Sequence, residues 1–311
     1  MSKLKYKKLL EISGHKKGVS CTSFSPNGEF LASCSGDLTG RIWSTKTGKQ
    51  VALVDGHTRG MSHISWSKCG RYFATSSDDC TTRVWDLETS QCVRIMNEHK
   101  SYVYCSVFNN KENIIASSSY DETAILWDLR TERSIRTITG HTAPISYLDF
   151  SHDDTLITTC SLNGLCRIWD SRTIKCYKTL GNPASNKPCT SVQFTPNSVY
   201  LVLGNLGSRI RLWDCYNGNC MRSYEGHLNE KLLVIFDSLY MGEKQNYLVS
   251  GSEDSKVYIW DFDSKEIVQT LEGHESPVIS VSCNSKTGLI ASGSISPENI
   301  ITIWSPNEEN D

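Results

Sequence analysis

A cassette of about eleven residues recurs seven times along this chain and constrains its fold more than any other feature. The clearest copy, residues 251–261, reads GSEDSKVYIWD: small residues, an acidic turn, and an alternating segment that ends in Trp-Asp. Close copies occupy residues 76–86, 118–128 and 160–170, and weaker ones occupy residues 34–44, 204–214 and 293–305. Alternation of this kind is typical of a half-buried β-strand. The seven marker tryptophans are spaced by 42, 42, 42, 44, 47 and 44 residues: Trp43, Trp85, Trp127, Trp169, Trp213, Trp260 and Trp304.

Each unit contains four short strand-like segments separated by turn residues. In the first unit these segments are residues 19–24, 30–34, 39–43 and 50–54. Four short strands in a unit of about 40–45 residues, opened by Gly-His and closed by Trp-Asp, are typical of one blade of a WD-repeat propeller. The sequence therefore predicts an all-β, seven-bladed β-propeller of WD repeats. We expect a single propeller domain over residues 4–305 and an acidic C-terminal tail over residues 306–311.

The two ends of the chain predict how the ring closes. After Trp304 only residues 305–311 remain, and they are too polar and too few for an outer strand. Residues 4–12 alternate well enough to form that strand. An open strand edge would invite pairing with other chains. We therefore expect the N-terminal strand to complete the seventh blade.

Composition and charge exclude several classes of function. The chain has 311 residues, a formal net charge of −2 and a pI of about 6.5. Its net charge therefore gives no electrostatic attraction to phosphate backbones or anionic lipid. We expect no direct nucleic-acid binding and no membrane span, because no apolar run approaches the roughly 20 residues that a span needs. The thirteen cysteines include no Cys-x-x-Cys pair, so we expect no metal site and a reducing compartment, nuclear or alternatively cytoplasmic.

Repeated histidines and aspartates could be mistaken for catalytic triads. A histidine opens six of the units, and the position six residues before the marker tryptophan carries an acidic residue in four; the seventh unit has no clear equivalent. These residues are His15, His57, His99, His141, His227 and His274, and Asp37, Asp79, Asp121, Asn163, Gly207 and Asp254. We interpret them, with a strand Ser or Thr and the indole N–H, as buried hydrogen-bond relays. Catalysis needs one site rather than six, and no nucleophile elbow, phosphate loop or His-Glu-x-x-His motif is present. We expect no enzymatic activity and no cofactor.

Residues that the repeat leaves unexplained are the candidates for function. The position before each turn residue should lie at one mouth of the central channel, and a second ring should lie five residues after each unit-opening histidine. The first ring is Gly36, Asp78, Tyr120, Leu162, Leu206 and Glu253; the second is Ser20, Ser62, Tyr104, Ser146, Leu232 and Ile279. Asp78 has no assigned structural partner, and Tyr102 and Tyr120 are expected near Tyr104. An acid with clustered aromatic rings suits a guanidinium or ammonium guest. Tyrosines that simply plug the channel are the competing interpretation, and the sequence leaves both open.

Several strings outside the common cassette resemble one family, the WD-repeat subunit of COMPASS/MLL histone methyltransferase complexes. They are NGLCRIWD at 163–170, GHLNEK at 226–231, SGSED at 250–254 with VYIW at 257–260, KEIVQ at 265–269 and SPNGEFLAS at 25–33. The similarity runs from about residue 9 to residue 304. The resemblance implies a non-catalytic protein whose channel holds an arginine side chain of a histone tail, or of the methyltransferase, between two aromatic rings.

The resemblance also implies site residues. Tyr104 would be one aromatic ring, and Phe236 is the candidate for the second, within residues 232–240, where this chain has extra residues. Two positions depart from the family: Ala143 replaces an acid and Leu162 replaces a tyrosine. The positions that match or nearly match the pocket are Gly18, Ser20, Gly36, Ser62, Asp78, Tyr102, Tyr120, Pro144, Ser146 and Thr190.

A second surface implied by the resemblance is a cleft on the opposite face, between the fifth and sixth blades, which takes an acidic-hydrophobic peptide. Its matching residues are Asn197, Tyr200, Leu212 and Gln269. We therefore expect a scaffold of a nuclear chromatin-modifying complex, a monomeric propeller within a hetero-complex, that binds arginine-bearing peptides. The alternative is a WD-repeat adaptor of another assembly, such as a ubiquitin ligase or an RNA-processing complex.

Overall fold

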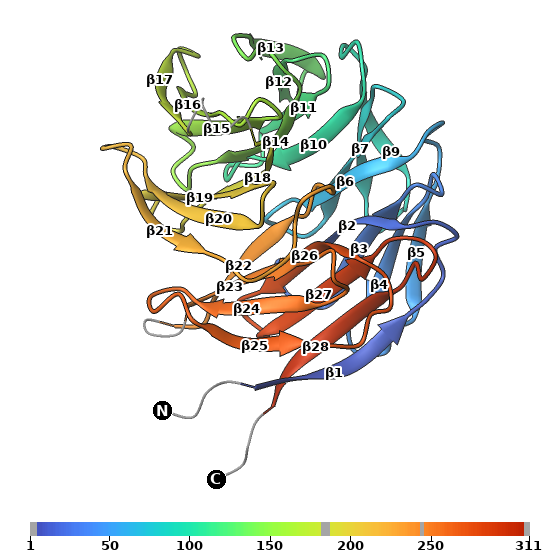
Figure 1. The fold of residues 1–311 in the computed structure, drawn as a ribbon. Helices are drawn as coiled ribbons and strands as arrows, with labels where there is room; N and C mark the ends of the chain where they lie inside the picture. Colours follow the sequence, from blue (N-terminus) through green and yellow to red (C-terminus); the bar gives the residue numbers. More distant parts are fainter. Residues whose placement is uncertain (1–4, 182–186, 243–245, 308–311) are drawn as a thin grey trace.

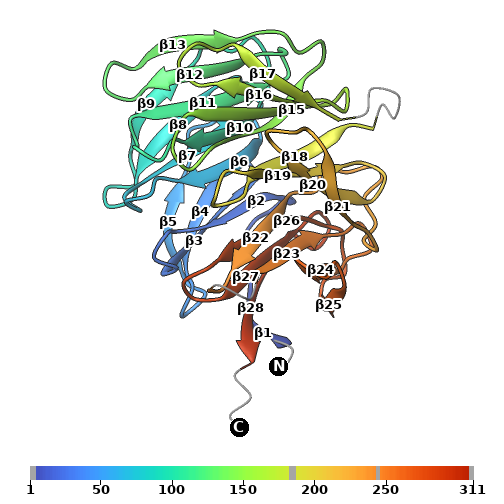
Figure 2. The same cartoon turned by 90° about the vertical axis from the view of Figure 1, so that its left-hand side faces the viewer.

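A computed structural model describes residues 5–181, 187–242 and 246–307, and it confirms the seven-bladed all-β propeller (Figures 1 and 2). The described residues form strands and turns, with no helix among them. Every blade is a four-stranded antiparallel sheet. Within the first six blades, each strand pairs with the next along the chain, which the short Gly-, Asn- and Asp-containing turns permit.

The strands have the following bounds. The first three blades are β2 (Val19–Phe24), β3 (Phe30–Ser35), β4 (Gly40–Ser44) and β5 (Gln50–Val54); β6 (Met61–Trp66), β7 (Tyr72–Ser77), β8 (Thr82–Asp86) and β9 (Cys92–Met96); and β10 (Val103–Phe108), β11 (Ile114–Ser119), β12 (Ala124–Asp128) and β13 (Arg133–Ile138). The next three are β14 (Ile145–Phe150), β15 (Leu156–Ser161), β16 (Cys166–Asp170) and β17 (Cys176–Leu180); β18 (Cys189–Phe194), β19 (Tyr200–Asn205), β20 (Arg209–Asp214) and β21 (Cys220–Tyr224); and β22 (Phe236–Tyr240), β23 (Asn246–Gly251), β24 (Val257–Asp261) and β25 (Ile267–Leu271). The seventh blade is β26 (Val278–Asn284), β27 (Leu289–Ser294), β28 (Ile301–Asn307) and β1 (Lys5–Ile12).

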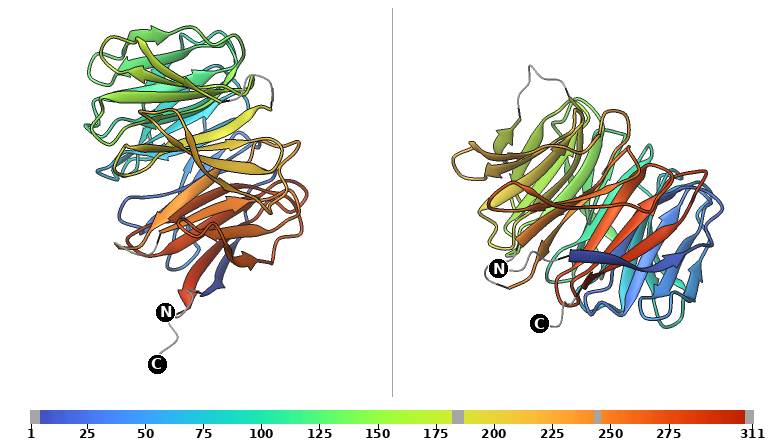
Figure 3. Two further views of the ribbon diagram at one scale, coloured as in Figure 1. Left: turned by 60° about the vertical axis from the view of Figure 1, so that its left-hand side comes forward. Right: turned by 60° about the horizontal axis from the view of Figure 1, so that its bottom comes forward.

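The N-terminal strand closes the ring, as predicted. β1 runs antiparallel to β28, from Ile12 opposite Ile301 to Lys5 opposite Asn307, and the two strands lie side by side in Figure 3. Tyr6 is buried, and its hydroxyl donates to the Gly288 carbonyl at 3.0 Å. Pairing with β1 carries β28 to Asn307, so the first two residues of the expected 306–311 tail belong to the blade. Residues 308–311 lie outside the described part of the chain.

The apolar core lies between neighbouring blades. Between the first two blades, Ile42 of β4 packs with Met61 and Ile64 of β6 and with Phe73 of β7, all nearly inaccessible to solvent. A buried aliphatic or aromatic side chain contributes roughly 1.5–3 kcal/mol. Each inner strand therefore has a fixed position against its neighbours, which determines which side chains reach the central channel.

The predicted hydrogen-bond relay is complete in the first, second, third and seventh blades. In the second blade, the Trp85 indole N–H donates to Thr75 Oγ1 at 2.8 Å, and that hydroxyl lies 2.8 Å from His57 Nε2. His57 Nδ1 lies 2.8 Å from Asp79 Oδ2. An indole can only donate, so Thr75 donates its own proton to Nε2, and Nδ1–H donates to the carboxylate. Every polar group of this buried set is satisfied, which supports its structural role.

The seventh blade completes its relay from an insertion. The sequence indicated no equivalent of the turn aspartate there, yet Glu298 Oε2 lies 3.2 Å from His274 Nδ1. The Glu298 carboxylate also accepts from the backbone N–H groups of Glu275 and Ser276 at 3.1 and 3.2 Å. The longer glutamate side chain spans the distance that the inserted residues add, so sequence spacing alone could not identify it.

The fourth and sixth blades have incomplete relays. Asn163 stands in the acidic position of the fourth blade, and His141 Nδ1 has no partner there. In the sixth blade, Asp254 instead accepts from the Tyr258 hydroxyl at 2.8 Å, and both ring nitrogens of His227 lack partners. Burial lowers the pKa of His141 and of His227 to about 4, so both are neutral at physiological pH.

We predict that the relay makes stability fall in acid. Burial alone would raise the pKa of Asp79, but hydrogen bonds from Thr81, His57 and the Thr58 amide outweigh it and lower the pKa to about 2. Its stabilisation is therefore full above the unfolded-state pKa near 4, and it is lost as the pH falls from about 4 to about 2. Asp79→Asn should lower the free energy of unfolding at pH 7 by about 2 kcal/mol, measured by urea titration of tryptophan fluorescence.

The converse variant serves as the control. Asn163→Asp supplies the missing carboxylate to His141 in the fourth blade and should raise the melting temperature at pH 7 by about 2 °C, with the gain lost below pH 4. Identical pH profiles for the wild type and Asp79→Asn would contradict the assignment.

Candidate functional site

Five of the six residues of the second predicted ring converge on a cavity at one mouth of the channel; the sixth, Leu232, does not line it, and Leu233 and Ile235 do so instead. The cavity has a volume of about 190 Å³. It is lined by Ser20, Ser62, His63, Tyr104, Ser146, Tyr147, Thr190, Leu233, Ile235 and Ile279. Five of the predicted pocket residues are in this set, because each occupies the second position of a first strand, where the side chain faces the axis. Thr190 is buried and its hydroxyl has no partner, so the cavity wall has a free polar group.

The first predicted ring forms the rim above this cavity. In each of the first five blades, one backbone hydrogen bond ties a turn residue to the loop that precedes the first strand. The donors and acceptors are Gly36 N to Gly18 O at 3.4 Å, Asp78 N to Gly60 O at 2.9 Å, Tyr120 N to Tyr102 O at 2.8 Å, Leu162 N to Pro144 O at 2.9 Å and Leu206 N to Pro188 O at 2.9 Å. The predicted rim residues are thus brought together in pairs by the fold. Ala143 lies in the same loop as Pro144, and its carbonyl accepts from Ser161 at 3.0 Å.

Three tyrosines cluster at the rim. The ring centroids of Tyr102 and Tyr120 are 6.0 Å apart, and those of Tyr104 and Tyr120 are 6.3 Å apart. Tyr102 and Tyr120 are exposed, whereas Tyr104 is half-buried. The Arg59 guanidinium lies 6.0 Å from the Tyr102 ring centroid. A cationic side chain of the protein itself therefore already contacts the tyrosine cluster, at the distance typical of cation–π contact.

The rim positions carry two carboxylates, Asp78 and Glu253, and Glu253 Oε1 already accepts from the backbone N–H groups of residues 230–232 at 2.8, 2.6 and 2.8 Å. The sequence assigned Asp78 no structural partner, but Ser62 Oγ donates to its Oδ1 at 3.2 Å. Burial raises the pKa of Asp78, and the Ser62 hydrogen bond and the Arg59 charge offset this only in part. A carboxylate whose ionised form is disfavoured by burial gains free energy when a cation binds beside it. The rim is therefore chemically suited to a cationic guest.

The second aromatic ring is not at the mouth. Phe236 opens β22, is buried, and would lie 3.2 Å from a Cβ added at Gly204, so it packs between the fifth and sixth blades. It lines a deeper chamber of the channel, while Leu233 and Ile235 line the mouth. The extra residues before β22 decide this register, which Phe236 opposite Ser250 establishes. A guest at the mouth would therefore meet Tyr104 opposite the aliphatic side chains of Leu233 and Ile235, with Tyr147 and His63 on the cavity wall.

A larger cleft of about 450 Å³ lies between the fifth and sixth blades. Three of the four predicted residues, Asn197, Tyr200 and Leu212, line it. The remaining lining residues are Thr195, Pro196, Met221, Arg222, Tyr240, Gly242, Asn246, Phe262 and Asp263. Arg222 Nη1 donates to Asp263 Oδ1 at 2.8 Å and to the Phe262 carbonyl at 2.7 Å. The cleft thus combines an apolar wall with a positioned guanidinium.

Gln269, the fourth predicted cleft residue, has a different role. Its Oε1 accepts from the Tyr6 N–H at 2.7 Å, and its Nε2 donates to the Tyr6 carbonyl at 2.9 Å. The side chain amide thus links β25 of the sixth blade to β1 of the seventh, and Gln269 does not line the cleft. Sequence alone could not show this, because the partner is 263 residues away.

The described residues contain no group of three or more His, Cys, Asp or Glu side chains placed to hold a metal ion. All thirteen cysteines are free, and burial raises the pKa of the Cys21 thiol to about 12. In the part of the chain described, no helix is long and apolar enough to cross a membrane.

Comparison with known proteins identifies the type of propeller. A family model described as the WDR5 beta-propeller domain matches residues 11–305. Shorter segments match WD-repeat proteins: 44% identity over 45 residues with an uncharacterized WD repeat-containing protein of Schizosaccharomyces pombe (14% of this chain, 5% of that protein); 49% over 43 residues with WD repeat, SAM and U-box domain-containing protein 1 of Danio rerio (14% and 9%); and 51% over 35 residues with transducin beta-like protein 2 of Mus musculus (11% and 8%). The chain thus matches less than a tenth of the length of each of these relatives, about one repeat unit.

We predict that Gln269 acts on stability and not on the cleft. Gln269→Ala removes both hydrogen bonds to the Tyr6 backbone and should lower the free energy of unfolding by about 1–2 kcal/mol, measured by urea titration. Gln91→Ala, at an exposed glutamine, is the matched control and should change it by less than about 0.5 kcal/mol. Equal stability of the two variants would show that the bridge to β1 is dispensable.

Proposed function

The chain belongs to the WDR5-type WD-repeat β-propeller family, and from this premise we propose that it is a non-catalytic scaffold of a nuclear chromatin-modifying complex. WD-repeat propellers are typically non-catalytic and generally mediate protein–protein interactions. The family suggests a histone methyltransferase complex as the assembly. In this proposal, the channel mouth takes an arginine side chain and the cleft between the fifth and sixth blades takes a partner peptide.

One observation carries the proposal for the mouth: Asp78 and three tyrosines surround the entrance of a cavity of about 190 Å³. A guest guanidinium would pair with Asp78 and stack on Tyr104, while its methylene groups would contact Leu233 and Ile235. Pairing would offset the burial that raises the pKa of Asp78. Because the blades hold these groups in place before binding, little conformational entropy is lost.

The cleft supports a second peptide surface on the same scaffold. Tyr200, Leu212, Met221 and Phe262 offer apolar contact, and Met221 is 54% exposed. A carboxylate of the peptide could replace Asp263 as the partner of Arg222, because Asp263 is exposed and its pair with Arg222 is weakly held. An acidic peptide with apolar side chains fits this combination.

The composition of the mouth favours one alternative, a WD-repeat adaptor of another multiprotein complex. Leu233 and Ile235 stand where a second aromatic ring would be needed to sandwich a guanidinium, and Arg59 already lies near Tyr102. In that case the cleft, and not the mouth, would be the principal partner site.

We predict that a fluorescein-labelled histone H3 tail peptide binds through its arginine. Asp78→Asn and Tyr104→Ala should each weaken binding at least tenfold in fluorescence polarisation, because they remove the ion pair and the stacking ring respectively. The same peptide with citrulline in place of arginine should bind at least tenfold more weakly. Asp55→Asn, at an exposed aspartate outside the channel, is the charge-matched control. Absence of binding to the wild type would favour the adaptor alternative.

The cleft can be tested with a pair of variants at equivalent positions. Met221 and Val51 occupy the same place in the outer strands β21 and β5, and both are 54% exposed. Against a panel of acidic peptides that carry Val, Ile or Leu at alternate positions, Met221→Glu should weaken binding at least tenfold, and Val51→Glu less than twofold. The added carboxylate repels the peptide and removes apolar contact in the cleft alone. Equal effects of the two variants would exclude the cleft as the binding surface.

A further inference from the structure

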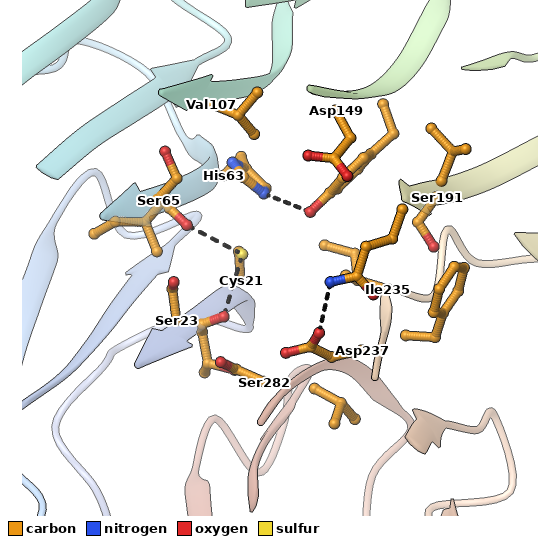
Figure 4. A pocket seen from close by; sticks show the side chains of 17 residues that line it. Cys21, Ser23, His63, Ser65, Val107, Asp149, Ser191, Ile235, Asp237 and Ser282 are labelled. Atoms are coloured by element: carbon orange, nitrogen blue, oxygen red, sulfur yellow. Dashed lines mark hydrogen bonds between the residues drawn. The ribbon is translucent and has the colours of Figure 1, made fainter. Parts of the chain in front are cut away.

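A second chamber lies deeper in the channel, at its waist. Its volume is about 170 Å³, and Figure 4 shows side chains from all around the ring pointing into it. Each blade contributes one residue from an equivalent place on its innermost strand, toward the strand's end in six blades and at the second residue of the shorter β22 in the sixth. These residues are Ser23, Ser65, Val107, Asp149, Gln193, Asp237 and Ser282. Two of the seven positions are therefore carboxylic acids.

Backbone and side-chain amides hold both acids in place. Asp149 Oδ2 accepts from Phe194 N at 2.8 Å, which links the fourth blade to the fifth. Asp237 Oδ2 accepts from Cys283 N at 2.7 Å, which links the sixth blade to the seventh, and its Oδ1 accepts from Gln193 Nε2 at 3.0 Å. The two carboxyl groups are thus part of the rigid wall and cannot swing away from the chamber.

The chamber contains no matching positive charge. Among the described residues that line it there is no lysine or arginine, and the one basic group is His63. Burial lowers the pKa of His63 to about 4, so its ring is neutral at physiological pH. Burial also raises the pKa of the acids, to about 7 for Asp149 and about 6 for Asp237. The other titratable neighbours are neutral thiols and phenols: Cys21, Cys105, Tyr147, Tyr240 and Cys283.

Two further polar atoms of the wall have no partner. Ser191 is 2% exposed, its Oγ makes no hydrogen bond, and it lines the chamber (Figure 4). Gln193 Oε1 is also buried and unpartnered. Buried polar atoms without hydrogen bonds are costly. Two carboxylates, a hydroxyl and an amide oxygen together form a set rich in acceptors, which calls for a guest that donates and carries positive charge.

The chamber adjoins the mouth cavity. His63, Tyr147 and Ile235 line both cavities, so they form the partition between them. The His63 ring packs edge-on against Tyr147, with centroids 5.2 Å apart, and Nε2 lies 3.0 Å from the Tyr147 hydroxyl. A guest that enters from the mouth must displace this pair, and a slender methylene chain requires less displacement than a planar guanidinium. An ammonium group has three donors and no acceptor, which matches the wall beyond.

We propose that the waist chamber binds a primary ammonium group, supplied by a linear polyamine or by a lysine side chain of a partner peptide that enters through the mouth. The site does not depend on arginine recognition at the rim, since none of its acidic groups belongs to the rim.

The test is isothermal titration calorimetry, which measures the affinity of the whole chain for spermidine at pH 7.5. Asp149→Asn and Asp237→Asn each keep one oxygen that can accept the backbone N–H bond from the next blade, but they remove the charge; the double variant should bind at least tenfold more weakly. Asp55→Asn should bind within twofold of wild type. Affinity should fall at least fivefold from pH 7.5 to pH 5.5, because the acids take up protons in that range. Ser191→Ala, which leaves both acids in place, should weaken binding severalfold and serves if the double variant does not fold.

A parallel titration with a lysine-containing peptide and its norleucine counterpart distinguishes the two sources. Loss of spermidine binding in the aspartate variants supports a free polyamine, and loss of lysine-peptide binding supports a side chain. The proposal is overturned if neither ligand binds in a way that depends on Asp149, Asp237 or Ser191. Failure of the arginine-peptide test at Asp78 would leave this result unaffected, so the two proposals fail separately.

Discussion

Closure of the ring is the constraint on which the rest of this structure depends. A four-stranded sheet has two open edges and two faces, and it is stable in water only if its faces are covered and its edges protected. Seven blades cover each other's faces, and β1 covers the outer edge of β28 in the last blade. Tyr6 anchors this strand through its side chain in the core, and its backbone is bound by Gln269 of the preceding blade. The N-terminal strand is thus held twice, by β28 within its own sheet and by Gln269 of the neighbouring sheet.

The relays show how each blade is held once the ring is closed. The His57 relay ties the loop before the first strand to the turn before the third strand, through the indole of Trp85. This holds the rim loops, and through them Asp78 and the tyrosines, in one arrangement. The sixth blade lacks the relay and instead stacks Tyr258 on Trp260, with centroids 5.7 Å apart. Trp260 donates to the Glu225 carbonyl at 3.0 Å, so its indole is still satisfied. The rim loop of the sixth blade therefore differs from those of the other blades, and the residues that this blade contributes to the mouth, Leu233 and Ile235, are aliphatic.

The channel has two levels with different chemistry, although the same inner strands build both. The mouth joins a carboxylate with phenol rings and is partly open to solvent, so charge there is moderated by water and by Arg59. The waist places two carboxyl groups in enclosed surroundings with no cation beside them among the described residues. Moving three residues along one inner strand, from Ser146 to Asp149, changes the environment from the first level to the second. A guest could contact both the mouth and the waist only if it were long, narrow and positively charged.

The sequence alone determined the seven blades, the closing strand and most of the mouth. These features follow from the local repeat: the position of Tyr104 or Ser62 within its own unit specifies where the side chain points, because the pleat has a period of two residues. It also predicted three of the four cleft residues. Only the tertiary structure decided the role of Gln269, the place of Phe236, the contribution of Glu298 and the meeting of Asp149 with Asp237. Each of these depends on an insertion that shifts the register, or on a partner in another blade. Such contacts are set by packing across the ring, which no pattern within one repeat contains.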